Sequence, residues 1–140
     1  MGSNWFVALA GFLLIFNSAE ALVTIDVHEA KDLLDSGAYW YVDARTKEEF
    51  KEGYVDVKKI VNIPYMFKTP EGNFTKNPLF VKHVSSIFKN GCPLIVGCLS
   101  GSRSLHAATA LENSQGFKNV TNMGGGYSAW VKSGYPVKKP

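Results

Sequence analysis

Short apolar stretches alternate with helical patterns along almost the whole chain, and this alternation limits the folds open to it. Strands are expected where apolar, β-branched or aromatic residues cluster, and helices where apolar residues recur every three or four positions. The predicted strands are Val23–Asp26, Trp40–Val42, Val61–Ile63, Leu94–Gly97 and Val120–Met123. The predicted helices are His28–Ser36, one that begins after Thr46, Leu79–Phe88, Ser102–Asn113 and Tyr127–Lys132. Such alternation implies an α/β fold, with a five-stranded, mainly parallel sheet and helices on both faces.

Three local signals refine this picture. The most apolar strand, Leu94–Gly97, leads directly into Cys98. In parallel α/β sheets the ligand site lies beyond the carboxyl ends of the strands, so Cys98 is placed where a functional residue is expected. Thr46 begins its helix with a capping box, because Glu49 follows three residues later. Residues 65–78, with two prolines and a glycine, are expected to form a long loop.

The composition suits one globular domain and excludes one large class of function. The 140 residues are 46% hydrophobic and 19% charged, which is enough apolar material for a core. Lys and Arg total 15 while Asp and Glu total 12, which gives a net charge of +3. Nucleic-acid binding is not expected, because it requires a concentrated basic surface. A site for a small anion remains open, and nothing in the sequence requires more than a monomer.

The first 21 residues differ from the rest of the chain. An apolar run, Trp5–Phe16, is broken only by Gly11 and is followed by Ala19-Glu20-Ala21. This run is too short to span a bilayer, for which about 20 residues are needed, but it suits a secretory signal peptide cleaved after Ala21. The segment lacks Lys and Arg, so an uncleaved tail and a plastid or cytoplasmic location remain alternatives. We expect a targeting segment at 1–21, a domain at 22–140 and no stable membrane span.

The two cysteines, Cys92 and Cys98, are expected to be free thiols. The residues between them have the pattern of a buried strand, and six residues of extended chain span about 20 Å. A disulfide needs Cα atoms within about 7 Å of each other, so the two cannot pair inside one strand. Cys92 precedes Pro93 and is interpreted as inert packing. A free thiol is unusual in a secreted protein, and a chemical role for Cys98 would explain it.

Residues 98–103, which we call the Cys98 loop, run from the end of a strand to the start of a helix. Small residues in such a turn let backbone N–H groups curl inward around an anion, and the helix N-terminus adds partial positive charge. Both effects favour the nucleophilic thiolate form of a cysteine. Gly101 permits unusual dihedral angles, while Arg103 either binds a substrate anion or braces the loop against a carboxylate. Hydroxyl donors are available from Ser100, Ser102 and Ser104.

Several of these features also have simpler interpretations. Taken alone, Cys98 can equally be interpreted as a small buried hydrophobic residue at a strand end. Only the loop after it favours a catalytic role. His106, one turn into the following helix, is expected on a solvated face rather than as an acid or base. The glycine run at 124–126 lacks the lysine of a phosphate-binding loop. It is interpreted as a tight turn beside the Cys98 loop.

Five motifs in order give the chain a resemblance to the rhodanese homology family. They are Tyr41–Arg45, which contains Asp-x-Arg, Glu48–Phe50 with Gly53, Asn62–Pro64, Cys98–Arg103 and Gly124–Trp130. The likeness covers about residues 23–136 and is greatest to small single-domain plant thiosulfate sulfurtransferases of the senescence-associated type. It departs from the family at Tyr54, where histidine is usual, and at Ala44, where valine is usual.

The resemblance implies a thiosulfate sulfurtransferase that needs no metal and no organic cofactor. Cys98 would be the nucleophile, taking a sulfur atom from thiosulfate as a persulfide and passing it to cyanide or a thiol. The resemblance gives Asp43 and Arg45 a supporting role at the sheet edge. Glu49 is either the partner of Arg103 or part of a solvated helix face. The residues expected to bind the substrate are Leu99, Ser100, Gly101, Ser102, Arg103 and Ser104.

Two other functions stay open on this reasoning. The loop from Cys98 to Arg103 has six residues, as in sulfurtransferases of the family, whereas related phosphatases have seven. An arsenate reductase or phosphatase-like enzyme using the same cysteine is one alternative, and a non-catalytic redox-sensing or interaction module is the other. The expected partners are a small anionic sulfur donor, a thiol or cyanide acceptor, and a thioredoxin- or glutathione-type reductant.

Overall fold

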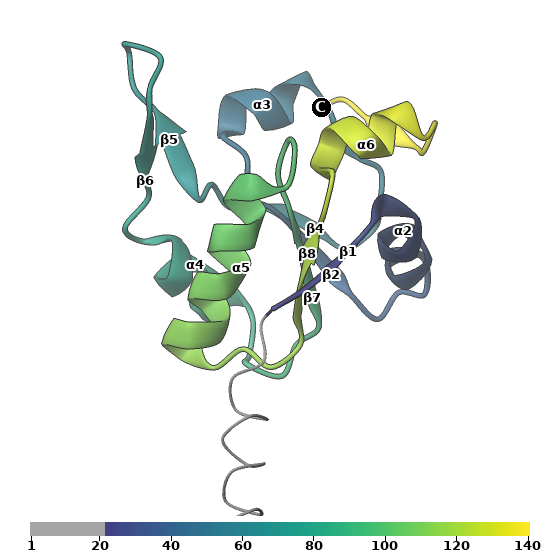
Figure 1. Ribbon diagram of the computed structural model, residues 1–140, viewed down its shortest axis with the longest axis horizontal. Coiled ribbons are helices and arrows are strands. Elements are labelled where there is room, and N and C mark those ends of the chain that lie inside the picture. The colour runs from purple at the N-terminus through teal and green to yellow at the C-terminus, as the bar shows by residue number, and fades with distance from the viewer. Residues whose placement is uncertain (1–21) are drawn as a thin grey trace, which may run out of the picture.

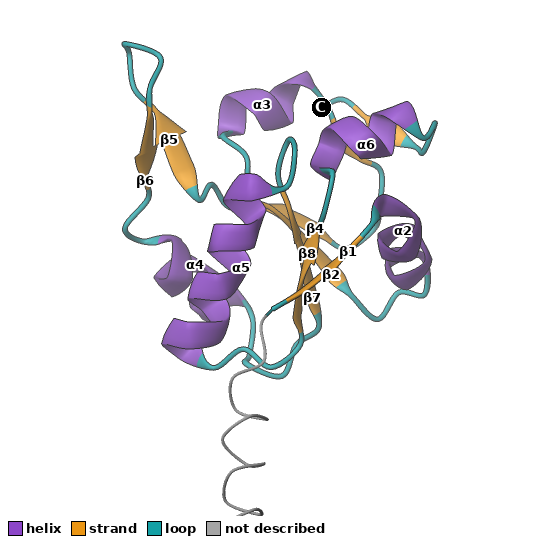
Figure 2. Cartoon of the chain, in the orientation of Figure 1, coloured by secondary structure: helices purple, strands orange, loops and turns teal. Residues whose placement is uncertain are grey.

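A five-stranded sheet forms the centre of the molecule in the computed structural model, which describes residues 22–140 (Figures 1 and 2). The strands in spatial order are β1 (Val23–Ile25), β8 (Val120–Met123), β7 (Leu94–Gly97), β2 (Trp40–Asp43) and β4 (Ile60–Asn62). All neighbouring pairs are parallel. The predicted sheet is therefore confirmed, with β7 at its middle. The targeting segment predicted at 1–21 lies outside the described residues.

Helices cover both faces of this sheet, as the alternation predicts. Figure 1 shows helices on both faces and a short helix, α3, above the carboxyl ends of the strands. One face carries α4 (Phe80–Ile87) and α5 (Ser102–Gln115), the other carries α2 (Val27–Asp35) and α6 (Gly126–Lys132), and α3 spans Lys47–Glu52. The capping box predicted for α3 is present, because Thr46 and Glu49 exchange hydrogen bonds of 3.1 Å.

Successive residues of the central strands point to opposite faces and fill two separate cores. In β7, Leu94 and Val96 pack in the core beneath α4 and α5, whereas Ile95 packs in the core beneath α2 and α6. In β2, Val42 and Tyr41 divide in the same way. A strand buried on both faces needs apolar residues at every position. This requirement explains why these strands appear in the sequence as continuous apolar runs.

The expectation of a long loop at residues 65–78 is wrong, because this segment contains a β-hairpin. β5 (Met66–Lys68) pairs antiparallel with β6 (Phe74–Lys76), and the Thr69 N–H donates to the Asn73 carbonyl at 2.7 Å. Every residue of β6 is exposed, so the strand lacks the alternation of buried and exposed positions that marks strands in a sequence. The hairpin lies on the same side of the molecule as α3 (Figure 2).

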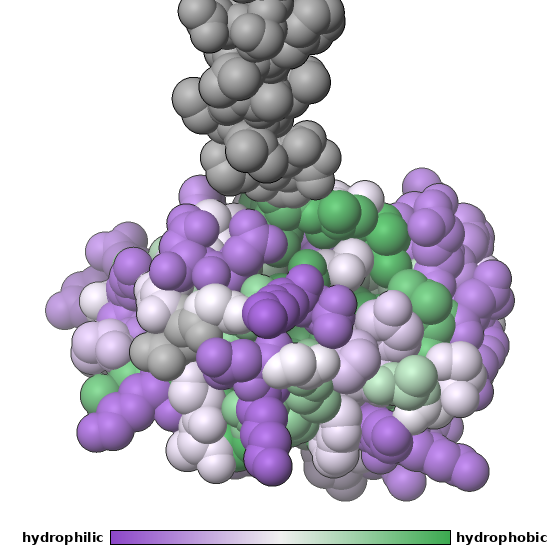
Figure 3. Space-filling view, turned by 90° about the horizontal axis from the view of Figure 1, so that it is seen from below, coloured by the Kyte–Doolittle hydropathy of each residue, from purple (hydrophilic) through white to green (hydrophobic). Residues whose placement is uncertain are grey.

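A second short pairing holds the end of the chain. β3 (Tyr54–Val55), just after α3, pairs antiparallel with β9 (Val137–Lys138). On the face seen from below in Figure 3, hydrophilic side chains prevail around a band of apolar ones. Among residues 22–140, no helix combines the length and apolar character needed to cross a bilayer.

Candidate active site

The Cys98 loop lies at the carboxyl edge of the sheet, where its position in the sequence predicts a site. Cys98 follows the last residue of β7, and α5 begins at Ser102. The loop therefore connects the middle strand of the sheet to the longest described helix, which begins in the next turn. A strand that is fully buried and a helix that packs against the sheet fix the two ends of this short segment, so its shape is set by the fold.

Hydrogen-bond donors surround the Cys98 sulfur. The Gly101 N–H points at Sγ from 3.1 Å, and the Ser104 hydroxyl lies 3.4 Å from it. Cys98 is only 1% exposed, so water competes little with these donors. A sulfur that carries negative charge would be stabilised by the Gly101 N–H, which is already oriented toward it.

Ser104 links the sulfur to a residue that sequence reasoning missed, Asn122 of β8. The Ser104 hydroxyl has one proton but three acceptors within reach: Cys98 Sγ, the Gly101 carbonyl at 3.2 Å and Asn122 Oδ1 at 2.6 Å. Ser104 and Asn122 are both buried. Ser104 therefore reaches the sulfur from inside the protein rather than contacting a molecule in the pocket. The sequence feature that points to Asn122 is its position: it is a polar residue in a buried strand, near the carboxyl end of that strand.

The glycine run at 124–126 clamps the Cys98 loop, as the interpretation of a tight turn beside it predicts. The N–H of Tyr127 donates to the Cys98 carbonyl at 2.8 Å, and that of Ser128 donates to the Leu99 carbonyl at 3.0 Å. A Cβ at Gly126 would lie 2.5 Å from both of those carbonyl oxygens. This contact leaves no room for a side chain, so glycine is required there.

Gly101 meets the same run from the other side. Its φ of +109° is rarely adopted by other residues, and a Cβ there would lie 3.2 Å from the Gly125 nitrogen. Gly101 is also the residue whose N–H bonds the sulfur. The close approach of the two glycine-containing turns thus sets the direction of a donor to Cys98.

Arg103 makes a bidentate ion pair with Glu49. Its two terminal nitrogens donate to the two carboxylate oxygens at 2.7 and 2.9 Å. Partial burial raises the pKa of Glu49, but hydrogen bonds from Arg103 and Thr46 outweigh burial and hold this pKa below its ordinary value. The pair joins the first turn of α5 to α3, which is one of the two arrangements expected from the sequence.

Asp43 and Arg45 form a second, deeper pair at the end of β2. Arg45 Nη2 donates to Asp43 Oδ2 at 2.8 Å and to the Gly53 carbonyl at 2.7 Å. The guanidinium lies 4.2 Å from the ring centre of Tyr127. Burial lowers the pKa of Arg45, and its hydrogen bonds to Asp43 more than offset that effect. Beside them, burial raises the pKa of Tyr41 well above its ordinary value.

A pocket of about 600 Å³ opens over the outer side of the Cys98 loop. One wall comes from α3 and the opposite wall from the β5–β6 hairpin. The Phe74 ring lies 4.9 Å from the Arg103 guanidinium carbon, which holds the hairpin against the loop. The lining residues are Thr46, Glu48, Glu49, Glu52, Met66, Lys68, Phe74, Leu99, Ser100, Ser102 and Arg103. Sequence reasoning identified Glu49 on α3 but missed the rest of both walls, because they come from segments distant from Cys98.

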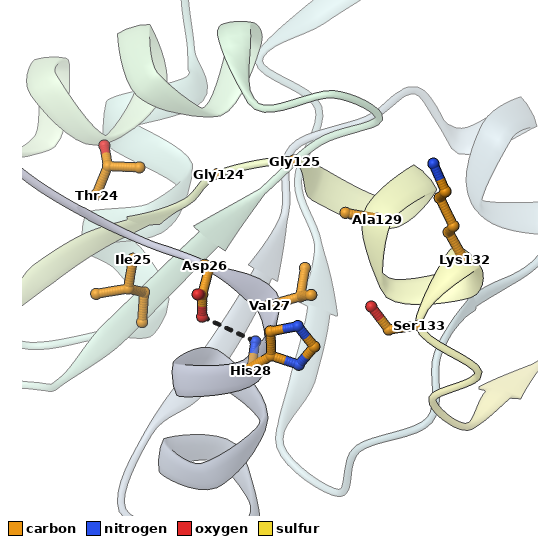
Figure 4. A pocket seen from close by; sticks show the side chains of 10 residues that line it. All are labelled: Thr24, Ile25, Asp26, Val27, His28, Gly124, Gly125, Ala129, Lys132 and Ser133. Carbon is orange, nitrogen blue, oxygen red and sulfur yellow. Dashed lines mark hydrogen bonds between the residues drawn. The ribbon is translucent and has the colours of Figure 1, made fainter.

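Of the predicted site residues, Glu49, Leu99, Ser100, Ser102 and Arg103 line this pocket, whereas Cys98, Gly101, Ser104, Asp43 and Arg45 do not. The other candidates also lie outside it. A second pocket, beside β1, α2 and α6, has Asp26, His28 and Lys132 in its wall and contains none of the predicted site residues (Figure 4). The Nδ1 atom of His28 is hydrogen-bonded to the Tyr135 hydroxyl. His106 is exposed on α5, and Cys92 is a half-buried free thiol. Within residues 22–140, no three His, Cys, Asp or Glu side chains are placed to hold a metal ion.

A parallel α/β sheet whose middle strand ends in a cysteine loop defines a recognisable class of protein. Residues 26–133 match the rhodanese-like domain, and the chain belongs to this family. It is 53% identical over 121 residues to rhodanese-like domain-containing protein 17 of Arabidopsis thaliana, covering 86% of this chain and 76% of that protein.

Two further Arabidopsis thaliana relatives have informative names. The chain is 49% identical over 119 residues to thiosulfate sulfurtransferase 18, which covers 85% of each. It is 46% identical over 123 residues to the protein HIGH ARSENIC CONTENT 1, mitochondrial, which covers 88% of this chain and 70% of that protein. Among solved structures, the rhodanese-like domain of the Anabaena Alr3790 protein superposes with a TM-score of 0.67 at 22% identity, covering 84% of this chain and 79% of that one. That likeness confirms the fold.

Proposed function

We propose that the protein is a thiosulfate sulfurtransferase that carries sulfur as a persulfide on Cys98. The observation that carries the proposal is the setting of the Cys98 sulfur, buried and facing the Gly101 N–H at 3.1 Å. Its membership of the rhodanese-like family and its 49% identity to thiosulfate sulfurtransferase 18 give the proposal independent support.

The proposed reaction has two steps that balance without an outside oxidant or reductant. The Cys98 thiolate attacks the outer sulfur of thiosulfate, a new S–S bond forms, and sulfite leaves with the electron pair of the bond that breaks. An acceptor thiolate or cyanide then attacks the outer persulfide sulfur, and the thiolate of Cys98 is regenerated. The products are an acceptor persulfide or thiocyanate, and the kinetics are ping-pong.

The surrounding residues have separate tasks in this scheme. The Gly101 N–H stabilises the charged sulfur, with the Ser104 hydroxyl close to it, while Leu99, Ser100 and Ser102 form the outer surface of the loop. Arg103 is held by Glu49 and keeps the loop closed. Asp43 and Arg45 hold the end of β2 beside it.

Incubation with thiosulfate and cyanide, with thiocyanate measured over time, tests this proposal. We expect the wild-type chain to form thiocyanate, and intact mass to show an added sulfur of about 32 Da. Cys98→Ser should abolish both signals. Cys92→Ser serves as the matched control and should retain both, since Cys92 lies outside the site. Undiminished activity in Cys98→Ser, or a wild type that adds only oxygen, would contradict the proposal, and the latter would favour a redox sensor.

Arsenate reduction by the same cysteine is a second candidate. It is favoured by the 46% identity to the protein named HIGH ARSENIC CONTENT 1. Conversion of arsenate to arsenite takes two electrons, which an external thiol such as glutathione supplies. Arsenite formation that depends on glutathione and on Cys98 would support this activity, and its absence at thiosulfate-active enzyme concentrations would exclude it.

A further inference from the structure

The pocket over the Cys98 loop is larger and more apolar than an inorganic sulfur donor requires. Its volume of about 600 Å³ is in the range of pockets that take sizeable organic ligands, whereas thiosulfate is a compact dianion without carbon. Met66, Phe74 and Leu99 contribute apolar surface to its lining, and Phe74 and Leu99 are 49% and 43% exposed. Two large apolar side chains left open at the entrance to one pocket fit an apolar group on a ligand.

The charges around the pocket favour a positively charged ligand along one wall. Glu48 and Glu52 both line the pocket, and their spacing of four residues puts them on the same side of α3. Within residues 22–140 neither carboxylate takes part in an ion pair. Arg103 contributes little free positive charge, because both of its terminal nitrogens are bound to Glu49. Lys68, on the hairpin, is the other cation of the lining.

We propose that the sulfur acceptor is a peptide or protein cysteine with an apolar and a basic side chain next to it. The apolar side chain lies against Phe74 and Leu99, and the basic one lies by Glu48 and Glu52. The acceptor thiolate attacks the outer sulfur of the Cys98 persulfide, and the bond to Cys98 breaks with its electron pair on Cys98. This inference rests on the proposed persulfide chemistry and adds the class of acceptor.

Transfer from preloaded protein to short peptides tests the acceptor class apart from the loading step. The full chain is loaded with thiosulfate until intact mass shows about 32 Da added on Cys98, then desalted. It is next mixed with N-acetyl-Leu-Cys-Lys-amide, with the Glu analogue Leu-Cys-Glu, or with Gly-Cys-Lys. Mass spectrometry follows the sulfur from protein to peptide. We expect Leu-Cys-Lys to react about fivefold faster than Leu-Cys-Glu at low salt, and this preference should shrink as salt screens the charges.

Charge reversal on the protein separates the pocket's contribution from the reactivity of the peptide thiol itself. In Glu48→Lys/Glu52→Lys the ratio of the Lys to the Glu peptide should fall to one or below, and in Phe74→Ala the advantage of Leu-Cys-Lys over Gly-Cys-Lys should disappear. Glu29→Lys/Asp32→Lys on α2 makes the same change in net charge away from the pocket and should keep the native ratio. A native ratio in the α3 variant overturns the acceptor proposal, whereas failure to load sulfur on the wild type overturns the proposed function before any peptide is added.

Discussion

Two arginine–carboxylate pairs flank the Cys98 loop, and they differ in how deeply they are buried. The side chains of Arg45 and Asp43 are 3% and 1% exposed, whereas those of Arg103 and Glu49 are 13% and 26% exposed. Arg45 also bonds a carbonyl and lies over the Tyr127 ring, while Arg103 lines the pocket. An arginine–carboxylate pair therefore has two different roles in this protein. The buried pair stabilises the fold, and the half-buried pair shapes the site.

Removal of the buried arginine is expected to have the largest effect on stability. Arg45→Met leaves the Asp43 carboxylate buried without its cation, and breaking a buried pair in this way costs about 3–5 kcal/mol of unfolding free energy. Urea unfolding followed by circular dichroism measures this loss. A loss below about 1 kcal/mol would show that the two pairs do not differ in the way their burial indicates.

Removal of the half-buried arginine should reverse the balance between stability and activity. Arg103→Met is expected to cost about 1 kcal/mol of unfolding free energy, because a pair that solvent still reaches contributes less than a fully buried one. Loading of sulfur onto Cys98 should nevertheless slow about tenfold, since the loop loses its tie to α3. Arg103→Lys should restore little of this loss, because lysine cannot bind both carboxylate oxygens in the planar arrangement.

Lys31→Met provides the matched control for that variant. It removes the ion pair of Lys31 with Asp35 on α2, away from the loop, and should leave the rate of sulfur loading unchanged. Equal slowing in the two variants would attribute the effect of Arg103→Met to general loss of charge.

The smallest effect is the pH dependence of the Glu49 contribution. The pKa of Glu49 is lowered in the folded protein, so its contribution to stability is complete above its unfolded pKa, about 4.3. This contribution is lost as the pH falls through the lower folded value. The difference in unfolding free energy between wild type and Glu49→Gln, under about 1 kcal/mol at pH 7, should shrink as the pH falls and vanish once Glu49 is protonated in the folded protein. A difference that grows as the pH falls would contradict this sign.

The parts of the fold that were predictable are those in which burial imposes a pattern. Leu94–Gly97 could be assigned to a strand because both of its faces are covered, and Thr46 to a helix start because its capping box is local in sequence. The hairpin strand Phe74–Lys76 could not be assigned, because exposed residues are under no such constraint. Sequence patterns therefore predict buried elements, whose residue types are constrained by the core, but not exposed strands, whose residue types are not.

The candidate site divides in the same way. Cys98 and its loop could be predicted because the strand, the cysteine, the glycine and the helix start follow one another within a few residues. Asn122 lies 2.6 Å from the Ser104 hydroxyl. Its role could not be predicted from the sequence, because only the packing of β8 beside β7 brings it there. The pocket walls from α3 and the hairpin likewise depend on the way distant segments meet.

The contact of Gly126 with the Cys98 loop also bears on the order in which the site is completed during synthesis. The ribosome makes Cys98 well before it makes Gly126, Tyr127 and Ser128, whose backbone closes over the Cys98 and Leu99 carbonyls. A nascent chain that has exposed Cys98 but not this last segment lacks the backbone contacts that shape the Cys98 loop. The shape of the loop around Cys98 is therefore completed only when the last part of the domain has folded against it.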